Sequence, residues 1–304
     1  MNKKSVVCFG EVLWDNLING RRVGGAPLNV CYHLHKKGVN SQIVSQVGGD
    51  REGKDLLEAI QSLGVDTTFV TKTQGYPTSQ VVVNPLPDGQ VTYEILENVA
   101  WDYLSFDPVV AAAIKGAAAF VYGSLAARNT ISRDTLFRYL PLSSLAVFDV
   151  NLRQPFFDKG LILDLMEQCH LLKINDEELH HIAGWRGLSG QTEDVLAGLL
   201  RAYPKMSEII LTRGVKGAVY YSRQKFLSLP GLSVKVVDTV GCGDSFLAAF
   251  LAHKLAGKPV DQSLRQAILL SAVVATLEGG CPIYGPNELG VMQQIVWSGA
   301  SLPD

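Results

Sequence analysis

Short apolar runs alternate with amphipathic segments along most of the chain. Residues 5–9 and 118–122 are almost wholly apolar, which is typical of strands in a parallel sheet that is covered on both faces. Residues 246–255 instead place apolar side chains at the i, i+4 spacing of a helix, and Gly257 and Pro259 end that helix. The alternation predicts an α/β fold with a doubly wound, mostly parallel central sheet and helices on both faces.

The same pattern predicts most of the remaining elements. Further strands are expected at 41–47, 67–70, 144–150, 171–174, 208–211, 219–221, 226–229 and 232–237. Further helices are expected at 28–37, 51–63, 107–115, 131–140, 161–169, 193–202, 260–277 and 286–297, with one more beginning at 175–178. No linker or internal repeat divides the chain, so residues 1–304 are expected to form a single domain.

One segment departs from the alternation of strands and helices. Residues 78–83 and 90–96 are rich in β-branched residues and flank a Pro87-Asp88-Gly89 turn, which predicts an antiparallel hairpin. We expect it outside the main sheet, as part of a discontinuous β lid over about 12–24 and 76–104; an edge hairpin without function is the alternative. Its apolar positions could pair with those of a second copy across a two-fold axis, giving a homodimer through the lid: Val81, Val83, Val91 and Ile95.

Composition narrows the class of protein. The net charge of −2 offers no basic surface for nucleic acid, and no apolar run has the ~18 residues that a membrane span needs. The apolar run after Lys3-Lys4 is interrupted by Gly10-Glu11 and Asp15, so no signal peptide is expected. The five cysteines are scattered and form no Cys-x-x-Cys, which fits a reducing cytosol. We therefore expect a cytoplasmic protein that binds neither nucleic acid nor membrane.

Residues 232–246 carry the strongest chemical signal. The expected strand 232–237 leads into a helix through Gly241-Cys242-Gly243, and Asp244 follows in the first turn. The first amides of a helix lack internal partners and carry the positive end of its dipole. Glycines let such amides approach an anion, and a carboxylate facing the same cleft could accept a proton. These are the parts of a phosphotransfer site, although a tight turn capped by Asp244 would have the same sequence.

A second glycine-flanked helix entry lies near the N-terminus. Gly24-Gly25 precedes Pro27, which favours the first turn of a helix. With Asp15 and Asn29 nearby, this entry could hold the hydroxyl groups of a polyol; a plain glycine-rich turn is the alternative.

Polar residues gather after the expected strands. In an open parallel sheet, ligands bind beyond the carboxyl ends of the strands. The residues that follow strands here are Asp15, the run Asp149-Val150-Asn151-Leu152-Arg153, Asn175, Glu178, Thr212, Gly214 and the run 241–244. Two common nucleotide fingerprints are absent: there is no Gly-x-x-x-x-Gly-Lys-[Ser/Thr], and Phe246 stands where Gly-x-Gly-x-x-Gly needs its third glycine.

A third pattern fits. Residues 238–246, Asp-Thr-Val-Gly-Cys-Gly-Asp-Ser-Phe, resemble the Asp-Thr-x-Gly-Ala-Gly-Asp-x-Phe signature of the ribokinase-like (PfkB) sugar kinases. Gly24-Gly25-Ala26-Pro27-x-Asn29-Val30 resembles that family's N-terminal signature, and Asn175-x-x-Glu178 its Asn-x-x-Glu motif. Together with Thr212-x-Gly214-x-x-Gly217, the matches come in the family's order and cover essentially the whole chain.

The resemblance implies an ATP-dependent sugar kinase and a role for each matching residue. Asp244 would be the base that takes the proton from the sugar hydroxyl, and the amides of Gly241, Cys242 and Gly243 would form the anion hole. Glu178 would act on Mg²⁺ through water. The turn near Gly279-Gly280 would lie close to the adenine, and the lid would exclude water. Sugar contacts are implied for Asp15, Gly24, Gly25, Asn29, Tyr93 and Arg153, and ATP contacts for Asn175, Thr212, Gly214, Gly217, Gly241 and Gly243.

Two residues depart from the family pattern. Cys242 replaces the usual alanine, which should matter little because the anion hole uses the backbone N–H. Val240 replaces a frequent threonine near the family's monovalent-cation site, where Asp238 is a possible ligand. Activation by K⁺ is therefore doubtful.

Three further motifs bear on the identity of the substrate. Gly10-Glu11-Val12-Leu13-x-Asp15, Asn98-Val99-Ala100-Trp101-Asp102 and Asp149-x-Asn151-x-Arg153 look like bacterial fructokinases, which implies D-fructose phosphorylated at O6. The last motif also occurs in 2-keto-3-deoxygluconate kinases, where an arginine can meet a carboxylate. Arg153 cannot separate the two, because an arginine near ATP phosphates would look the same, and the Arg21-Arg22 pair keeps an acidic sugar open. A ribokinase of the same family is a further alternative. A sugar-binding protein that kept the fold but lost catalysis is the alternative from another class.

Overall fold

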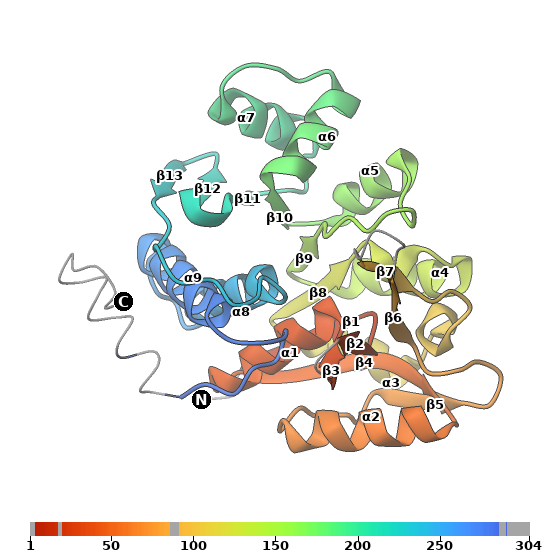
Figure 1. Ribbon diagram of the computed structural model, residues 1–304. Coiled ribbons are helices and arrows are strands. Elements are labelled where there is room, and N and C mark those ends of the chain that lie inside the picture. The colour runs from red at the N-terminus through yellow and green to blue at the C-terminus, as the bar shows by residue number, and fades with distance from the viewer. Residues whose placement is uncertain (1–3, 18–19, 86–90, 286–289, 291–304) are drawn as a thin grey trace.

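The main sheet of the computed structural model has nine strands in the order β13-β12-β11-β10-β9-β8-β1-β4-β5 (Figure 1). The structure describes residues 4–17, 20–85, 91–285 and 290. The strands from β11 to β5 pair in parallel, and β12 and β13 add an antiparallel edge. Their bounds are β1 (Ser5–Phe9), β4 (Asn40–Gly48), β5 (Val70–Thr73), β8 (Ala119–Gly123), β9 (Ala146–Asp149), β10 (Leu171–Asn175), β11 (Glu208–Thr212), β12 (Ala218–Ser222) and β13 (Lys225–Leu229).

Helices cover both faces of this sheet. One apolar cluster joins it to α1 (Ala26–Lys36), α2 (Arg51–Ser62), α8 (Cys242–Leu255) and α9 (Val260–Ala275). A second cluster joins the opposite face to α3 (Pro108–Gly116), α4 (Thr130–Tyr139), α5 (Lys159–Gln168), α6 (Asp176–Arg186) and α7 (Thr192–Ala202). The predicted doubly wound α/β architecture is confirmed. None of the described helices is long and apolar enough to cross a bilayer.

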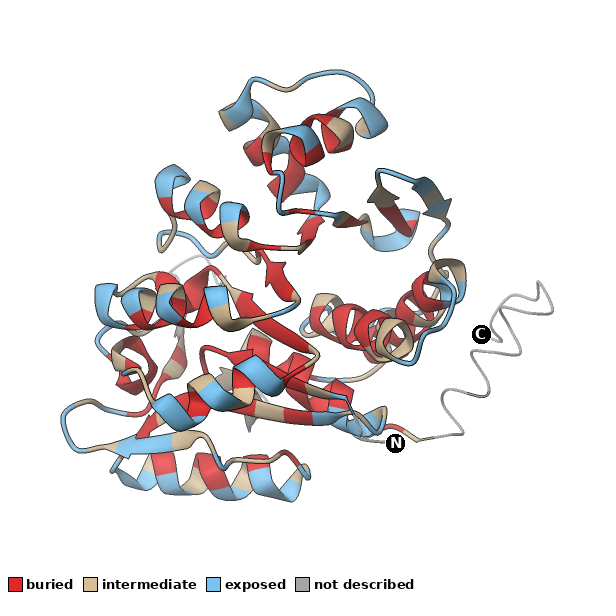
Figure 2. Ribbon diagram, turned by 180° about the vertical axis from the view of Figure 1, so that it is seen from behind, coloured by how far each residue is buried: buried red, intermediate tan, exposed pale blue. Residues whose placement is uncertain are grey.

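Side-chain alternation explains why the strands are apolar throughout. In β9, Val147 belongs to the first cluster and its neighbour Phe148 to the second, because successive side chains of a strand point to opposite faces. The central strands are buried along their length (Figure 2). The sheet can therefore expose functional groups only at the ends of its strands.

A second, four-stranded sheet lies in front of the carboxyl ends of the main strands, in the order β3-β2-β6-β7. Its strands are β2 (Leu13–Leu17), β3 (Gly20–Gly24), β6 (Gln80–Pro85) and β7 (Val91–Ile95). The 78–96 hairpin thus lies outside the main sheet, as predicted, and β6 joins β2 in parallel. The predicted turn at 87–89 and the predicted helix 286–297 lie outside the described residues.

One predicted strand is wrong. Residues 232–237 form no strand, although they alternate and are β-branched. Val236 and Val237 are 51% and 55% exposed, and the amide of Val237 donates to Ala275 O at the end of α9. The segment pairs with no strand of the sheet and crosses to α8 as a loop. Helix α8 begins at Cys242, so Asp244 lies in its first turn, as expected.

A buried arginine fixes the base of the small sheet. Arg128 Nε and Nη2 donate to the Asp102 carboxylate at 2.7 and 2.9 Å, and Nη2 also donates to Leu96 O just after β7. The guanidinium lies over the rings of Trp101 and Phe156, 4.1 and 4.6 Å from their centroids. Both charged side chains are almost fully buried. Arg128 therefore ties the end of the hairpin to the core.

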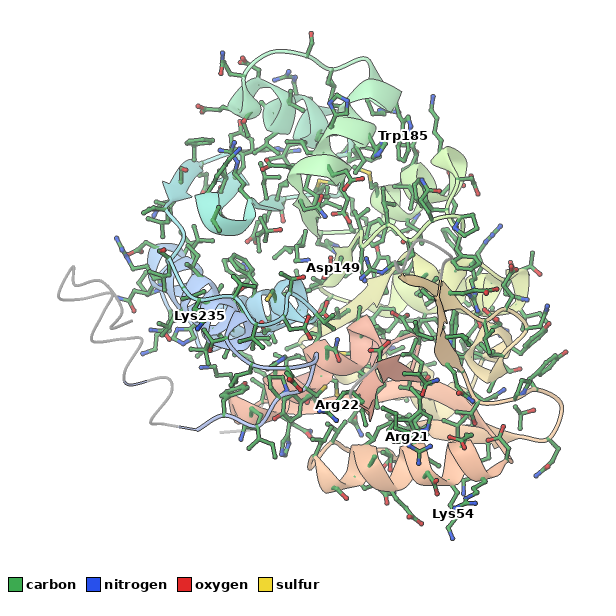
Figure 3. All side chains as sticks on the ribbon, in the orientation of Figure 1. Arg21, Arg22, Lys54, Asp149, Trp185 and Lys235 are labelled. Atoms are coloured by element: carbon green, nitrogen blue, oxygen red, sulfur yellow. The ribbon has the colours of Figure 1, made fainter. Side chains whose placement is uncertain are left out.

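We expect Asp102→Ala to lower the free energy of unfolding by about 3–5 kcal/mol, because it leaves the Arg128 cation buried without its partner. Urea denaturation measures the change. The matched control is Glu58→Ala, which breaks an ion pair with Lys54 whose partners are 63% and 71% exposed on the outer side of α2 (Figure 3). That control should cost no more than about 0.5 kcal/mol. If the free energy of unfolding falls equally in the two variants, the buried pair of Arg128 and Asp102 stabilises the protein no more than an exposed ion pair does.

Candidate functional site

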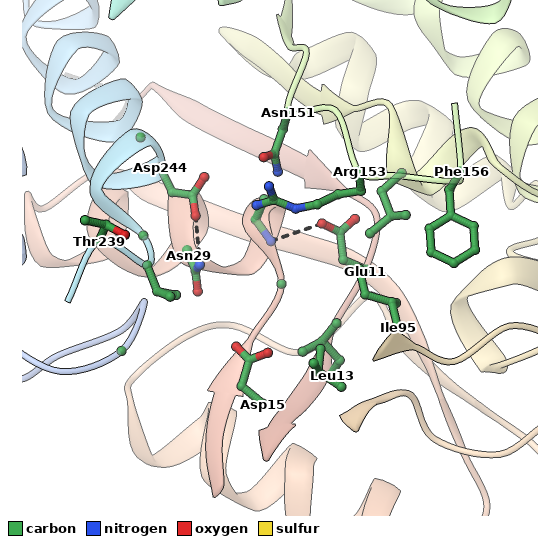
Figure 4. Close-up of a pocket in the computed structure, with 18 of the residues that line it drawn as sticks. Glu11, Leu13, Asp15, Asn29, Ile95, Asn151, Arg153, Phe156, Thr239 and Asp244 are labelled. Atoms are coloured by element: carbon green, nitrogen blue, oxygen red, sulfur yellow. Dashed lines mark hydrogen bonds between the residues drawn. The ribbon is translucent and has the colours of Figure 1, made fainter. Parts of the chain in front are cut away.

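A cavity of about 870 Å³ separates the small sheet from the carboxyl ends of the main strands (Figure 4). It brings together residues from β2, α1, β10, β11 and the N-terminus of α8. The predicted site residues that line it are Asp15, Gly25, Asn29, Arg153, Asn175, Glu178, Thr212, Asp238, Gly241, Gly243 and Asp244. Segments more than 200 residues apart in the sequence thus meet at one edge of the sheet.

Other predicted site residues lie beside this cavity and not in its wall. Gly24 lies against Asp15 and has no room for a side chain, because a Cβ there would lie 2.1 Å from Asp15 Oδ2. Gly217 belongs to the turn between β11 and β12, where a Cβ would lie 2.0 Å from Leu229 O. Gly214, in the same turn, and Cys242 are not among the lining residues either. The side chain of Tyr93 lies outside the described residues.

The N-terminus of α8 is built on close backbone contact. Gly241, the N-cap, has a left-handed conformation with φ of 75°, and a Cβ there would lie 2.6 Å from Gly280 Cα. The Cys242 amide donates to Thr239 O at 3.3 Å, so it is turned to the loop. Burial raises the pKa of the Cys242 thiol to about 11, which keeps it protonated. Gly243 faces the cavity, where a Cβ would lie 3.0 Å from Lys173 Nζ.

Asp244 does not cap its helix. It lies in the first turn of α8, 9% exposed, and its Oδ2 accepts a hydrogen bond from Asn29 Nδ2 at 2.8 Å. The Asn29 Oδ1 atom accepts in turn from Cys281 Sγ at 3.2 Å. Burial, together with the nearby Asp149 charge, raises the pKa of Asp244 to about 6, although Lys173, Asn29 and Arg153 oppose the rise. A carboxyl group in this state can exchange a proton near neutral pH.

A buried ion pair lies behind Asp244. Lys173 Nζ donates to Asp149 at 2.7 and 2.9 Å, and both side chains are less than one-tenth exposed (Figure 3). Burial alone would lower the pKa of Lys173, but the charges of Asp149, Glu178 and Asp244 outweigh it and raise that pKa. Lys173 is therefore the cation that lets several carboxyl groups share this edge of the sheet.

Two further carboxyl groups lie on the side of the small sheet. Burial raises the pKa of Asp15 to about 6 and that of Glu11 to about 7. The Arg153 charge opposes both rises, and Figure 4 shows its guanidinium beside Glu11. Strand β3 carries the Arg21-Arg22 pair. Arg21 forms ion pairs with Glu52 and Asp55 of α2, whereas Arg22 lines the cavity and pairs with Glu278.

The residues expected at a metal ion are already hydrogen-bonded. Asn175 caps α6: its Oδ1 accepts from the Glu178 amide, and Glu178 Oε2 accepts from the Asn175 amide. Glu178 Oε1 accepts from Leu152 N, so both carboxylate oxygens hold the backbone. No group of three His, Cys, Asp or Glu side chains among the described residues could hold a metal ion. This donor set fits Mg²⁺ that keeps its waters and meets Glu178 through one of them.

Asp238, expected as a possible ligand of a monovalent cation, is also already hydrogen-bonded. Asp238 Oδ1 accepts from the Val240 amide at 3.0 Å, and Oδ2 accepts from the Gly279 amide at 2.9 Å. The carboxylate thus joins the loop before α8 to the segment that follows α9.

The comparison with known protein families gives a match over most of the chain. Residues 5–284 match the model of the pfkB family carbohydrate kinases. The chain belongs to this family. It is thus a carbohydrate kinase, and the resemblance seen in its motifs is confirmed over nearly its whole length.

Individual relatives agree with this assignment. Fructokinase-1 of Zea mays is 28% identical over 322 residues, which cover 96% of this chain and 98% of that protein. The crystal structure of fructokinase with bound ATP from Xylella fastidiosa has a TM-score of 0.83 at 21% identity and covers 98% of this chain and 100% of its own. A putative ribokinase II from E. coli in complex with ATP and Mg²⁺ has a TM-score of 0.80 at 20% identity, covering 96% and 99%.

The structure of this kinase adds residues that the sequence analysis did not assign to the site. Glu11, Lys173, Asn151 and Phe156 all line the cavity. A signal for two of them was present: Lys173 is the one charged residue of the strand Leu171-Leu172-Lys173-Ile174, and Glu11 comes two residues after the apolar strand 5–9. A charge in or beside a buried strand must find a partner, and such a partner is often part of a site.

Lys173→Met should lower the free energy of unfolding by about 3–5 kcal/mol, because it leaves Asp149 charged and buried without a cation. The double variant Lys173→Met/Asp149→Leu should recover most of this loss, since both charges are then replaced by apolar groups. Chemical denaturation of both variants and of Asp149→Leu completes a double-mutant cycle. If the double variant is as unstable as Lys173→Met, the loss of stability does not come from leaving Asp149 without its cation.

Proposed function

We propose that this carbohydrate kinase transfers the γ-phosphoryl group of ATP to O6 of D-fructose, with Asp244 as the base. The observation that carries the proposal is the setting of Asp244: a buried carboxyl with a raised pKa, held by Asn29 at a helix N-terminus inside the cavity. Asp244 takes the proton of the sugar hydroxyl as its oxygen bonds to the γ-phosphorus. The bond from that phosphorus to the bridging oxygen of ADP breaks, and ADP leaves.

The backbone at the start of α8 supports this transfer. The amides of Gly241 and Gly243 lie at the positive end of the helix dipole, where negative charge on the moving phosphoryl group is stabilised. The amide of Cys242 would have to leave Thr239 O to take part. Lys173, next to Gly243, adds a fixed positive charge on the same side.

The nucleotide is proposed to lie along β10 and β11. Asn175 and Thr212 line this part of the cavity, and the turn that holds Gly214 and Gly217 continues it. Mg²⁺, when bound, neutralises phosphate charge, and Glu178 would meet it through water. Asp238 is a possible ligand of a monovalent cation, but both its oxygens already accept backbone amides, so we propose that K⁺ is not required.

The balance of charge favours a neutral sugar. Carboxyl groups outnumber cations in the cavity wall: Glu11, Asp15, Glu94, Glu178, Asp238 and Asp244 against Arg22, Arg153 and Lys173. The side that holds Asp15, Gly25 and Asn29 therefore suits hydroxyl groups better than the carboxylate of 2-keto-3-deoxygluconate. Fructose is the neutral sugar named for the relatives in maize and Xylella fastidiosa.

The small sheet is proposed to act as the lid. Val81 and Ile95 line the cavity, so this apolar side of the hairpin faces the sugar site. Such a wall would keep water from the γ-phosphoryl group. Pairing of two lids in a homodimer stays a prediction, and its contacts would have to come from the other side of the hairpin.

Asp244→Asn should lower kcat/KM for the sugar by roughly 10²- to 10⁴-fold, the range expected when a general base is lost. Wild-type kcat/KM should fall as the pH drops through about 6, because the base must be ionised and its pKa is raised to that value. A coupled assay of ADP release between pH 5 and 8 measures both effects.

The matched control is Asp261→Asn, which changes an aspartate in the first turn of α9, away from the cavity. This variant should keep the wild-type kcat/KM and the same decrease of kcat/KM at acid pH. An acid limb near the ordinary carboxyl pKa of ~4, or an Asp244→Asn variant with near-normal kcat/KM, would remove Asp244 from this role.

The sugar is tested by the same assay with Mg-ATP and fructose, ribose, glucose, adenosine and 2-keto-3-deoxygluconate. The expected result is the highest kcat/KM for fructose, with the phosphate at O6 by NMR. Higher turnover of 2-keto-3-deoxygluconate would end the fructose assignment and would make Arg153 the candidate partner of the substrate carboxylate.

A further inference from the structure

Glu11 has one oxygen that the protein leaves without a partner. The residue is 3% exposed and lines the cavity. Its Oε1 accepts a hydrogen bond from the Ala26 amide at 3.1 Å, while no group bonds to Oε2, which is buried. Among the buried carboxyl oxygens of the described residues, Oε2 of Glu11 is the only one in this state.

An unpartnered buried carboxyl oxygen is costly to the free protein, because water has been removed from it and nothing replaces that water. The neighbouring backbone nevertheless holds Glu11 in place. The Ala26 amide belongs to the first turn of α1, and a Cβ on Gly25 would lie 2.3 Å from Glu11 O. The side chain is therefore fixed before any ligand enters, as an orienting group in a binding site must be.

The position of Glu11 identifies the ligand it faces. In Figure 4 its carboxyl group lies beside Arg153, with Leu13 and Ile95 next to it and Asp244 beyond the guanidinium. Leu13 and Ile95 belong to strands of the small sheet, whereas the proposed nucleotide contacts come from β10 and β11. The group that reaches Oε2 must then be part of the sugar, at a distance from the hydroxyl that Asp244 serves.

We propose that Oε2 of Glu11 accepts a hydrogen bond from a second hydroxyl group of the sugar, one that is not phosphorylated, and so selects which sugars this kinase accepts. The inference rests on the proposed function, since it needs a sugar in this cavity. A site that buries an acceptor for a hydroxyl group rejects an analogue without that hydroxyl, because the acceptor is then left unpaired.

The test uses the best substrate of the wild-type enzyme and analogues of it that each lack one hydroxyl group. Wild type should discriminate against one of them by about 10- to 100-fold in kcat/KM through this contact, the size of a hydrogen bond to a charged group. In Glu11→Ala this discrimination should fall to within about 3-fold, while the other analogues keep their wild-type ratios to the parent sugar. Glu11→Gln, which keeps the shape and an amide oxygen, should give an intermediate ratio.

The control is Glu58→Gln, an exposed glutamate of α2, which should leave every ratio unchanged. Thermal melting of each variant verifies that it is folded. A purely structural role for Glu11 would lower kcat/KM for all sugars by the same factor and leave the ratios intact, and that result would overturn the proposal.

The two proposals fail in different ways. If wild type phosphorylates none of the sugars, the proposed function fails, and isothermal titration of the panel into wild type and Glu11→Ala tests the contact alone. Loss of the same single-hydroxyl discrimination in binding supports the role of Glu11, and equal binding patterns in the two proteins exclude it.

Discussion

The site depends on placing several carboxyl groups at the same buried edge of a sheet. Asp149, Glu178 and Asp244 are each less than one-tenth exposed, and the charge of Asp149 raises the pKa of both Glu178 and Asp244. A single buried cation, Lys173, is close enough to act on all three. Without it, the pKa values of Glu178 and Asp244 would rise further, and less of Asp244 would be ionised near neutral pH. The arrangement places the lysine inside the central sheet, where β10 is held by neighbours on both sides.

The close approach of backbones is the second constraint. Gly241 touches Gly280, and Gly25 touches Glu11, in each case at a distance that a side chain would prevent. These contacts bring the loop before α8 against the segment after α9, and the start of α1 against the end of β1. The turn at the start of α8 and the turn at the start of α1 thus share one wall. A carboxylate and an amide can meet there, as Asp244 and Asn29 do.

The sequence was sufficient for the fold and for those parts of the site that lie within one motif. Gly241 to Asp244, Gly24 to Asn29 and Asn175 to Glu178 are local signals, because each needs a strand or loop that leads directly into a helix. The pair of Lys173 and Asp149 is not local: the two residues lie on neighbouring strands, and only the register of β9 with β10 makes them partners. The expected strand 232–237 failed for a related reason. Its alternation of β-branched residues suits a strand, but a strand also needs a partner, and this segment instead crosses to the end of α9, where the Val237 amide donates to Ala275 O.

The segment after α9 links the stability of the protein to the geometry of its base. His33 of α1 is buried, and burial lowers its pKa to about 4, so the ring is neutral at physiological pH. Since Gly280 O can only accept, His33 Nε2 donates to it at 3.0 Å, and Nδ1 accepts from the Tyr284 hydroxyl at 2.9 Å. The Tyr32 hydroxyl donates a hydrogen bond to Pro282 O. These bonds fix residues 280–284 on α1, where Cys281 meets Asn29 and Gly280 meets Gly241. The orientation of Asn29, and through it that of Asp244, is therefore set by a segment that is remote in the sequence and takes no part in the proposed proton transfer.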